Sequence, residues 1–267
     1  MDANLGRVVI TGVAGRVGPT VREGLRGEVG DLVLVDRRRL TAGEGETVIE
    51  GDVTDPDVAR KAFEGADAVV HLAGCSDEAP FRELVDANIT GTFTVLEAAR
   101  RSGVRRVVLA GSNRVTGAYP IHHHVFPDEP LRPDGLYAVS KAAVEALGQM
   151  YADKFGLEVV VLRLGSFEAE PTETRHLATW LSPRDCVGFV RAALTASGVG
   201  YSAVYAVSAN ARRFWDLTAG ERELGYRPVD DAARFASRFP DDDPFWQGGP
   251  QSGEAATAEF TLPYLAE

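Results

Sequence analysis

Short runs of apolar residues alternate with longer amphipathic stretches along this chain, and that alternation limits the possible folds more than any other feature. The runs are rich in Val and Leu and hold almost no polar residues, which is typical of strands buried on both faces of a parallel sheet. They lie at residues 8–10, 32–35, 48–49, 68–72, 107–110 and 159–162. The sequence therefore predicts an α/β fold with a doubly wound parallel sheet.

Segments with helical periodicity fill the gaps between these runs, at residues 17–25, 57–63, 81–102 and 136–155. Such helices form the right-handed crossover connections that consecutive parallel strands need. The number of strands matches a Rossmann sheet. We therefore expect residues 1–164 to form a nucleotide-binding Rossmann domain.

The pattern changes after about residue 164. A polar, irregular segment, two helical segments and a late strand follow, at 165–179, at 183–196 and 219–224, and at 203–207. From Pro240 onward the chain is rich in Pro, Asp and Gly, which predicts a tail along the surface. We expect residues 165–267 to complete the sheet and to form a small substrate-binding segment, within a single compact unit.

Composition excludes several classes of function. The chain has 267 residues, 39 of them acidic and 28 basic, and a net charge of −11, so nucleic acid is not an expected partner. It has neither a signal peptide nor an apolar stretch of about 18 residues, so neither export nor a membrane location is expected. Cys75 and Cys186 lack disulfide or zinc spacing, which favours a reducing cytoplasm. The histidines at 122–124 are expected in an exposed loop, and no metal is predicted.

A glycine motif follows the first apolar run directly. The segment Thr11-Gly12-Val13-Ala14-Gly15-Arg16-Val17-Gly18 leads from a predicted strand into a predicted helix. Glycines at this spacing permit a tight turn and a close approach of the backbone to a pyrophosphate, while the helix N-terminus offers N–H groups and a positive dipole. In this context the motif predicts a dinucleotide site formed by Gly12, Gly15, Arg16, Val17 and Gly18.

Asp36 closes the second predicted strand. An acidic side chain at this place accepts hydrogen bonds from the adenosine ribose and repels a 2′-phosphate, which selects NAD over NADP. The arginines at 37–39 leave NADP open, because a neighbouring arginine can receive that phosphate. After the third strand, Asp52 and Val53 are expected to flank the adenine ring.

The residues with the clearest chemistry are Tyr137, Lys141 and Ser112. Positions i and i+4 share a helix face, so Tyr137 and Lys141 present a phenol and an ammonium to the same site. A nearby cation favours the phenolate, which makes Tyr137 a candidate general base, and Lys141 can also reach the nicotinamide ribose. Ser112 follows a predicted strand, at the edge where such sheets bind ligands, so its hydroxyl can hold the substrate oxygen beside Tyr137.

Together these motifs resemble the short-chain dehydrogenase/reductase superfamily, in its extended, epimerase-like branch. Two more segments strengthen the match, His71-Leu72-Ala73-Gly74 and Ala87-Asn88-Ile89-Thr90-Gly91-Thr92, and the resemblance covers at least residues 7–164. It implies that Leu72, Ala73, Gly74 and Asn88 belong to the cofactor site. It also implies a homo-oligomer, because long helices of this superfamily often pair between subunits.

A narrower resemblance, over nearly the whole chain, is to bacterial uronate dehydrogenases. The similar segments are 111–113, 132–137, 163–166, 175–182 and 208–210. The resemblance implies oxidation of the anomeric carbon of glucuronate or galacturonate with NAD, giving an aldaric acid lactone. By position it implies that Ser112, Tyr137 and Lys141 are catalytic. It further implies that the sugar acid contacts Ser76, Asn113, Ser166 and Arg175, with Arg175 binding its carboxylate.

One position departs from that group. Its members usually read Ser-Asn-His where this chain reads Ser112-Asn113-Arg114, and the histidine lies near the substrate pocket. We therefore include Arg114 among the candidate substrate-binding residues. It would strengthen selection of anionic sugars, change the preferred sugar, or pair with a nearby acid at the surface, and the sequence does not choose among these.

Other functions remain open at this stage. A related branch oxidises glucose 6-phosphate with NAD, so a sugar phosphate is an alternative substrate. Nucleotide-sugar epimerases and dehydratases share the Ser, Tyr and Lys residues but need a larger carboxyl-terminal domain. A non-catalytic NAD-sensing regulator on the same fold is less favoured, because such proteins often lack the Tyr and Lys pair.

Overall fold

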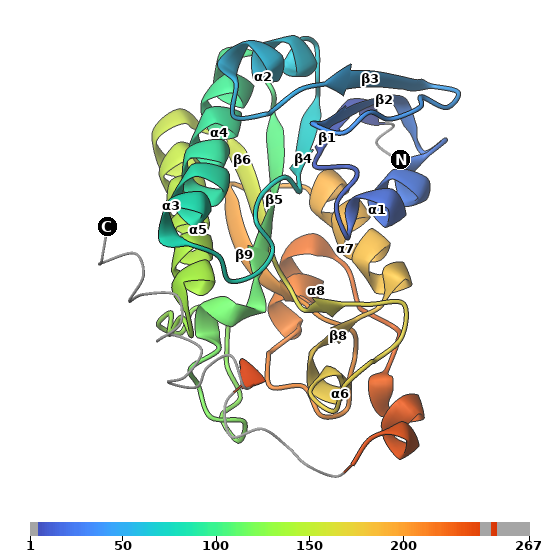
Figure 1. The fold of residues 1–267 in the computed structure, drawn as a ribbon, viewed down its shortest axis with the longest axis vertical. Helices are drawn as coiled ribbons and strands as arrows, with labels where there is room; N and C mark the ends of the chain where they lie inside the picture. The colour runs from blue at the N-terminus through green and yellow to red at the C-terminus, as the bar shows by residue number, and fades with distance from the viewer. Residues whose placement is uncertain (1–4, 241–246, 250–267) are drawn as a thin grey trace.

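The computed structural model describes residues 5–240 and 247–249 of the chain. Seven strands form one parallel sheet in the order β3-β2-β1-β4-β5-β6-β9 (Figure 1). The strands are β1 (Leu5–Thr11), β2 (Val29–Asp36), β3 (Glu46–Glu50), β4 (Ala68–His71), β5 (Arg106–Ser112), β6 (Glu158–Leu164) and β9 (Tyr201–Ala206). The chain order reverses direction between β1 and β4, which is where ligands bind in open α/β sheets.

Helices cover both faces of this sheet (Figure 1). The described helical segments are α1 (Gly18–Leu25), α2 (Pro56–Phe63), α3 (Phe81–Leu84), η1 (Val85–Thr90), α4 (Gly91–Arg101), η2 (Asn113–Thr116), α5 (Leu136–Phe155), α6 (His176–Thr179), α7 (Pro183–Thr195), α8 (Thr218–Leu224) and η3 (Ala232–Arg238). One apolar core joins the sheet to α1, α7 and α8, and a second joins its other face to α2, α4 and α5. No helix in the described ranges is long and apolar enough to cross a membrane.

The predicted doubly wound sheet is confirmed. The helix predicted over residues 81–102 consists of three consecutive pieces, because the π-helical turn η1 separates α3 from α4. The irregular segment after residue 164 also holds two short strands that pair in parallel, β7 (Ser166–Phe167) and β8 (Trp180–Leu181). The division of the chain at residue 164 stays a prediction. The tail predicted from Pro240 onward lies outside the described residues, apart from Pro240 and residues 247–249.

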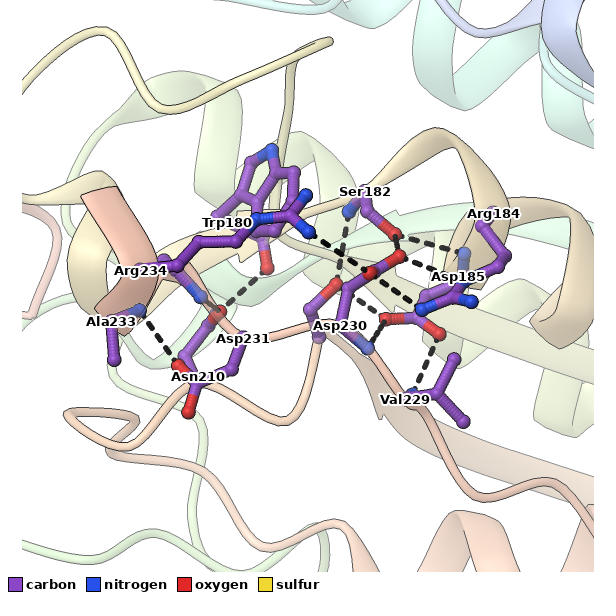
Figure 2. A network of polar contacts seen from close by, with 12 residues as sticks. Trp180, Ser182, Arg184, Asp185, Asn210, Val229, Asp230, Asp231, Ala233 and Arg234 are labelled. Atoms are coloured by element: carbon purple, nitrogen blue, oxygen red, sulfur yellow. Dashed lines mark hydrogen bonds and ion pairs between the residues drawn. The ribbon is translucent and has the colours of Figure 1, made fainter.

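A buried polar network fixes the segment that carries α6 and β8 (Figure 2). Asp185, in the first turn of α7, is fully buried, and its carboxylate accepts hydrogen bonds from Ser208 Oγ at 2.6 Å and from Tyr226 Oη at 2.8 Å. The N–H groups of Val229 and Asp230 donate to the same carboxylate at 2.9 and 3.0 Å. Because these donors come from two separate segments, one after β9 and one after α8, Asp185 ties both segments to the start of α7.

Asn210 links the same network to β8. Its amide nitrogen donates to the carbonyl oxygens of Ala178 and Trp180 at 3.1 and 2.8 Å, and its amide oxygen accepts from Ala232 N at 3.0 Å. Ser208 Oγ accepts a further bond from Ser182 N at 3.0 Å. The segment from α6 to α7 is therefore held by side chains that lie later in the chain, in addition to its own small apolar cluster.

We predict that Asp185→Ala strongly destabilises the fold. The substitution removes the acceptor of four hydrogen bonds and leaves buried donors unpaired, which we expect to cost about 3 to 5 kcal/mol of unfolding free energy. Urea unfolding followed by tryptophan fluorescence measures this change. Asp57→Ala on α2 is the control, because the Asp57 side chain is 86% exposed and should change stability by no more than about 0.5 kcal/mol. Equal midpoints for the two variants would contradict the role of the network.

Candidate active site

A cavity opens at the carboxyl edge of the sheet, where β1, β4, β5 and β6 end. Most of the residues predicted for cofactor, catalysis and substrate line it. These are Gly12, Gly15, Arg16, Val17, Gly18, Leu72, Gly74, Ser76, Ser112, Asn113, Arg114, Tyr137, Lys141, Ser166 and Arg175. Asp36, Asp52, Val53, Ala73 and Asn88 do not line it. The fold thus gathers residues from both halves of the chain around one space.

The glycine loop packs too closely for any side chain at two positions. Gly12 has a φ of +71°, and a Cβ there would lie 2.5 Å from the backbone nitrogen of Ala73. A Cβ on Gly18 would lie 2.1 Å from the carbonyl oxygen of Val13. Ala73 therefore packs against the loop, and Gly18, the first residue of α1, lines the cavity, so the N-terminus of a helix lies at its edge. This arrangement fits a dinucleotide pyrophosphate.

Asp36 ends β2 beside the glycine loop. Its Oδ2 accepts a hydrogen bond from Ala14 N at 2.8 Å, and its Oδ1 accepts one from Arg38 N at 2.9 Å. The carboxylate therefore also supports the loop, a contact that the sequence analysis did not include. The guanidinium of Arg38 lies beside it, with Nε 3.4 Å from Oδ1. A ribose bound at this edge of the sheet would meet both a carboxylate and a cation.

The two residues predicted near the adenine lie after β3. Asp52 is partly exposed, and its Oδ1 accepts hydrogen bonds from the N–H and the hydroxyl of Thr54. The Arg37 guanidinium lies 3.8 Å from the Asp52 carboxylate. Val53 is buried in the core that α2 covers. Asp52 thus shapes the turn after β3, and the adenine contact of both residues stays a prediction.

Asn88 has a different place from the cavity-lining residues. It is buried in η1, where its side-chain oxygen accepts a hydrogen bond from Cys75 N at 2.8 Å. Its side-chain nitrogen donates to Ser140 Oγ, also at 2.8 Å. Asn88 therefore joins the loop after β4 to the helix that carries Tyr137 and Lys141. Its predicted cofactor contact stays a prediction.

Tyr137 and Lys141 share one face of α5, as their spacing predicts, and both are buried. The Lys141 ammonium lies 5.8 Å from the centre of the Tyr137 ring and donates to the carbonyl oxygen of Ala110 at 2.9 Å. Ser112 is the last residue of β5, and its hydroxyl oxygen accepts a hydrogen bond from Arg114 N at 3.2 Å. The three predicted catalytic side chains therefore lie around one point of the cavity.

Burial moves the two ionisable groups toward their neutral forms. It raises the pKa of Tyr137 to about 12 and lowers the pKa of Lys141 to about 8. A hydrogen bond from Ser112 and the positive charge of Arg114 oppose the shift of the phenol. Tyr137 is therefore protonated at neutral pH, and a positive charge bound beside it would favour the phenolate.

The segment after β6 contributes Ser166 and Arg175 to the wall of the cavity. The Ser166 hydroxyl shares a hydrogen bond of 2.8 Å with Thr179. Arg175 precedes α6, and its Nε donates to Glu173 at 3.2 Å. Gly249 packs against the stem of this arginine, because a Cβ there would lie 2.5 Å from Arg175 Cδ. The sequence analysis gave no signal for Gly249 at this wall.

Arg114 is buried, which corrects the alternative of an acid pair at the surface. Its Nε donates to both carboxylate oxygens of Asp134, at 2.9 and 3.0 Å, and its NH2 donates to Glu78 at 3.2 Å. Both carboxylates are buried as well. The sequence did not predict Glu78 and Asp134 as partners of Arg114, since the two residues lie on separate loops, although Asp134 falls within the similar segment 132–137.

No group of three or more metal-ligating side chains occurs among residues 5–240 and 247–249. In the loop before α5, His123 bonds to Glu129 at 2.7 Å and stacks on Tyr119. His124 packs edge-on against Phe126, with the ring centres 5.3 Å apart.

Comparisons with known proteins agree with this geometry. Residues 8–184 match the NAD dependent epimerase/dehydratase family. The chain is 38% identical to a uronate dehydrogenase of Pseudomonas syringae pv. tomato, over 91% of this chain and 92% of that protein. It is 36% identical to an NAD-dependent glucose-6-phosphate dehydrogenase of Haloferax volcanii, over 85% of this chain and 95% of that protein.

Among solved structures, the fold superposes on a variant uronate dehydrogenase from Agrobacterium tumefaciens in complex with NAD. The TM-score is 0.87 at 38% identity, over 92% of this chain and 97% of that one. The family match, over residues 8–184, includes the glycine loop, helix α5 and the wall with Arg175. The chain therefore belongs to the NAD dependent epimerase/dehydratase family, in the group that contains the uronate dehydrogenases.

Proposed function

We propose that this protein is an NAD-dependent dehydrogenase that oxidises the anomeric carbon of a hexuronate, such as glucuronate or galacturonate, to the aldaric acid lactone. The observation that carries the proposal is the cavity itself. A phenol, an ammonium and a hydroxyl line it, from Tyr137, Lys141 and Ser112, and Arg175 lines the same cavity. This combination suits a substrate with both an oxidisable hydroxyl and a carboxylate.

The residues divide the reaction among them. Bound NAD supplies the hydride acceptor, held by the glycine loop and by Asp36 at the ribose. Tyr137 as the phenolate takes the proton of the anomeric hydroxyl, and Ser112 holds the same oxygen by a hydrogen bond. Lys141 keeps a positive charge near the phenol and reaches the nicotinamide ribose. As the hydrogen on the anomeric carbon leaves as hydride, that carbon becomes the lactone carbonyl.

Substrate recognition follows from the same cavity. A guanidinium fork matches a carboxylate with two parallel hydrogen bonds, which makes Arg175 the proposed carboxylate anchor. Ser76, Asn113 and Ser166 would contact the sugar hydroxyls, and Arg114 borders the same space. Arg16 of the glycine loop lies 3.7 Å from Glu168 on the substrate wall, so the two walls meet at the cavity edge.

A sugar phosphate is the second candidate substrate. The guanidinium that binds a carboxylate can also bind a phosphate, and one relative is a glucose-6-phosphate dehydrogenase. An epimerase or dehydratase acting on a nucleotide sugar is less favoured, because the similarity covers only 55% and 50% of two nucleotide-sugar epimerases, against 92% of a uronate dehydrogenase. A non-catalytic regulator would have no use for the buried pair of Tyr137 and Lys141.

We also propose a cytoplasmic, homo-oligomeric protein. Both cysteines are free thiols, which suits a reducing compartment. Phe93 on α4 and Val139 on α5 are 49% and 43% exposed, and large apolar side chains on neighbouring helices favour burial against a second copy.

The function is tested with a panel of substrates. The purified protein should reduce NAD, followed by absorbance, with glucuronate or galacturonate. Glucose, galactose, glucose 6-phosphate and UDP-glucuronate should support a much lower rate. A higher kcat/KM with glucose 6-phosphate would replace the uronate by the sugar phosphate, and no reduction with any of them would favour the regulator. Tyr137→Phe is the control for this site and should lower kcat by about 10²- to 10⁴-fold while NAD still binds.

Asp36→Asn is predicted to narrow the preference for NAD over NADP. It removes the charge that repels a 2′-phosphate but keeps an oxygen for the Ala14 N–H, so the glycine loop keeps its support. We expect the ratio of kcat/KM for the two cofactors to fall by about 10-fold or more, equivalent to about 1.4 kcal/mol. Asp57→Asn on α2, whose side chain is 86% exposed, serves as the matched control. A ratio that does not move would exclude Asp36 from the ribose site.

Arg175→Ala is predicted to remove the preference for a sugar acid. The ratio of kcat/KM for glucuronate over glucose should fall by about 30-fold or more, since losing one partner of a desolvated charge pair costs about 2 kcal/mol or more. Arg175→Lys should recover only part of it, because a point charge replaces a fork. The control is Arg238→Ala on η3, a more exposed arginine paired with Glu170 on the same wall. An equal loss for both sugars would reject Arg175 as the anchor.

A further inference from the structure

Three loops meet at the start of the catalytic helix through one arginine. Arg114 of η2 binds Asp134, which lies just before α5, with Nε 2.9 and 3.0 Å from the two carboxylate oxygens. Its NH2 binds Glu78, in the loop after β4, at 3.2 Å. The side chains of Arg114, Glu78 and Asp134 are 7%, 9% and 0% exposed. We call these three residues the arginine clamp.

The arginine clamp also contacts Tyr137 directly. The second oxygen of the Glu78 carboxylate, Oε2, accepts a hydrogen bond from Tyr137 N at 3.1 Å, so Glu78 caps the first turn of α5. The Arg114 guanidinium lies 5.7 Å from the centre of the Tyr137 ring. Gly135 leaves room for these contacts, because a Cβ there would lie 2.0 Å from Glu78 Oε1 and 3.3 Å from Arg114 NH2.

We propose that Arg114 is a positioning residue for Tyr137. With Glu78 and Asp134 it fixes the start of α5 and holds a cation beside the phenol, and it does not bind the sugar carboxylate. This inference rests on the proposed function, in which Tyr137 is the general base. Where the related enzymes usually have the histidine of Ser-Asn-His, the arginine at position 114 would therefore act on the general base Tyr137 and would not select the sugar.

The charges around Arg114 argue against a role as a carboxylate anchor. One guanidinium faces two buried carboxylates, so the arginine clamp as a whole carries a net negative charge and would repel an anionic sugar. Nε and NH2 are already engaged. NH1 is buried with no hydrogen-bond partner among the described residues, and it lies 3.9 Å from the Asp77 carboxylate.

The same charges set the protonation of Tyr137. Arg114 and Ser112 favour the phenolate, whereas Asp77 and Cys75 disfavour it, and burial disfavours it most. Lys141 faces the ring from the next turn of α5, and Glu78 and Asp134 add negative charge behind Arg114. Removal of Arg114 would leave two carboxylates without their cation. The pKa of Tyr137 must then rise, so the active phenolate forms only at higher pH.

Two variants with opposite charge effects test the proposal. In Arg114→Met, the acidic limb of the kcat/KM profile against pH should move upward by about 1 unit, with the ratio for glucuronate over glucose unchanged. In Glu78→Gln, which removes a negative charge from the same place, the limb should move to lower pH. Arg82→Met on α3 is the control, because its side chain is 78% exposed and should leave the profile unchanged.

The two opposite shifts distinguish an effect of charge on Tyr137 from a loss of structure. If Arg114 had only a structural role, both variants would be slower, but the acidic limb of the kcat/KM profile would stay at the same pH. An unmoved limb combined with a fall in the glucuronate ratio in Arg114→Met would overturn the proposal and make Arg114 a substrate ligand. If Arg114→Met does not fold, Arg114→Lys replaces it. Arg114→Lys keeps the positive charge but loses the guanidinium with its paired N–H donors. The acidic limb of its kcat/KM profile should therefore stay near the wild-type pH, while kcat falls.

A second measurement does not depend on the substrate. The phenol is titrated by tyrosinate absorbance in the NAD complex, and the same titration of Tyr137→Phe is subtracted. The midpoint should rise in Arg114→Met and fall in Glu78→Gln. If the protein oxidises no uronate, the proposed function is wrong, but this titration still tests whether Arg114 acts on Tyr137. Equal midpoints in wild type and both variants would overturn it.

Discussion

Parallel pairing in register is the constraint on which the rest of this structure depends. Thr11 pairs with His71, and Ser112 pairs with Leu164, so β1, β4, β5 and β6 end at one edge of the sheet. Helices pack on both faces of the sheet, which leaves that edge as the place where loops from distant parts of the chain meet. The glycine loop, the serine after β5 and the wall after β6 share a cavity for this reason.

Buried polar groups then decide the shape of that cavity. The wall with Arg175 packs on a small apolar cluster, and the network around Asp185 and Asn210 holds its backbone from behind. On the other side, Asn88 and Arg114 hold the loops beside α5. A buried polar group is costly unless it is paired, so each of these groups allows few alternative arrangements. Because the loops around the cavity have few alternative arrangements, the side chains that line it are held in defined positions.

The sequence predicted correctly those features that depend on interactions between residues close together in the chain. The glycine spacing, the apolar strands and the shared helix face of Tyr137 and Lys141 depend on a few neighbouring residues, and each lies where the pattern predicts. It was less informative for the neighbours of Asn88: the motif did not predict that this side chain joins the loop after β4 to α5, and its cofactor contact stays a prediction. Motif matching identifies such a residue but does not say which neighbour it contacts.

The sequence by itself determined the sheet, the dinucleotide loop and the pair of Tyr137 and Lys141, because periodicity and spacing fix these over short distances. Only the tertiary structure decided the partners of Arg114. Its two buried carboxylates lie 20 and 36 residues away, and a salt bridge over such separations depends on how the loops fold together and exclude water. In the sequence, an arginine next to Asn113 is compatible with a surface ion pair or with a sugar ligand. Its burial beside Glu78 and Asp134, which decides between these roles, exists only once the chain has folded around it.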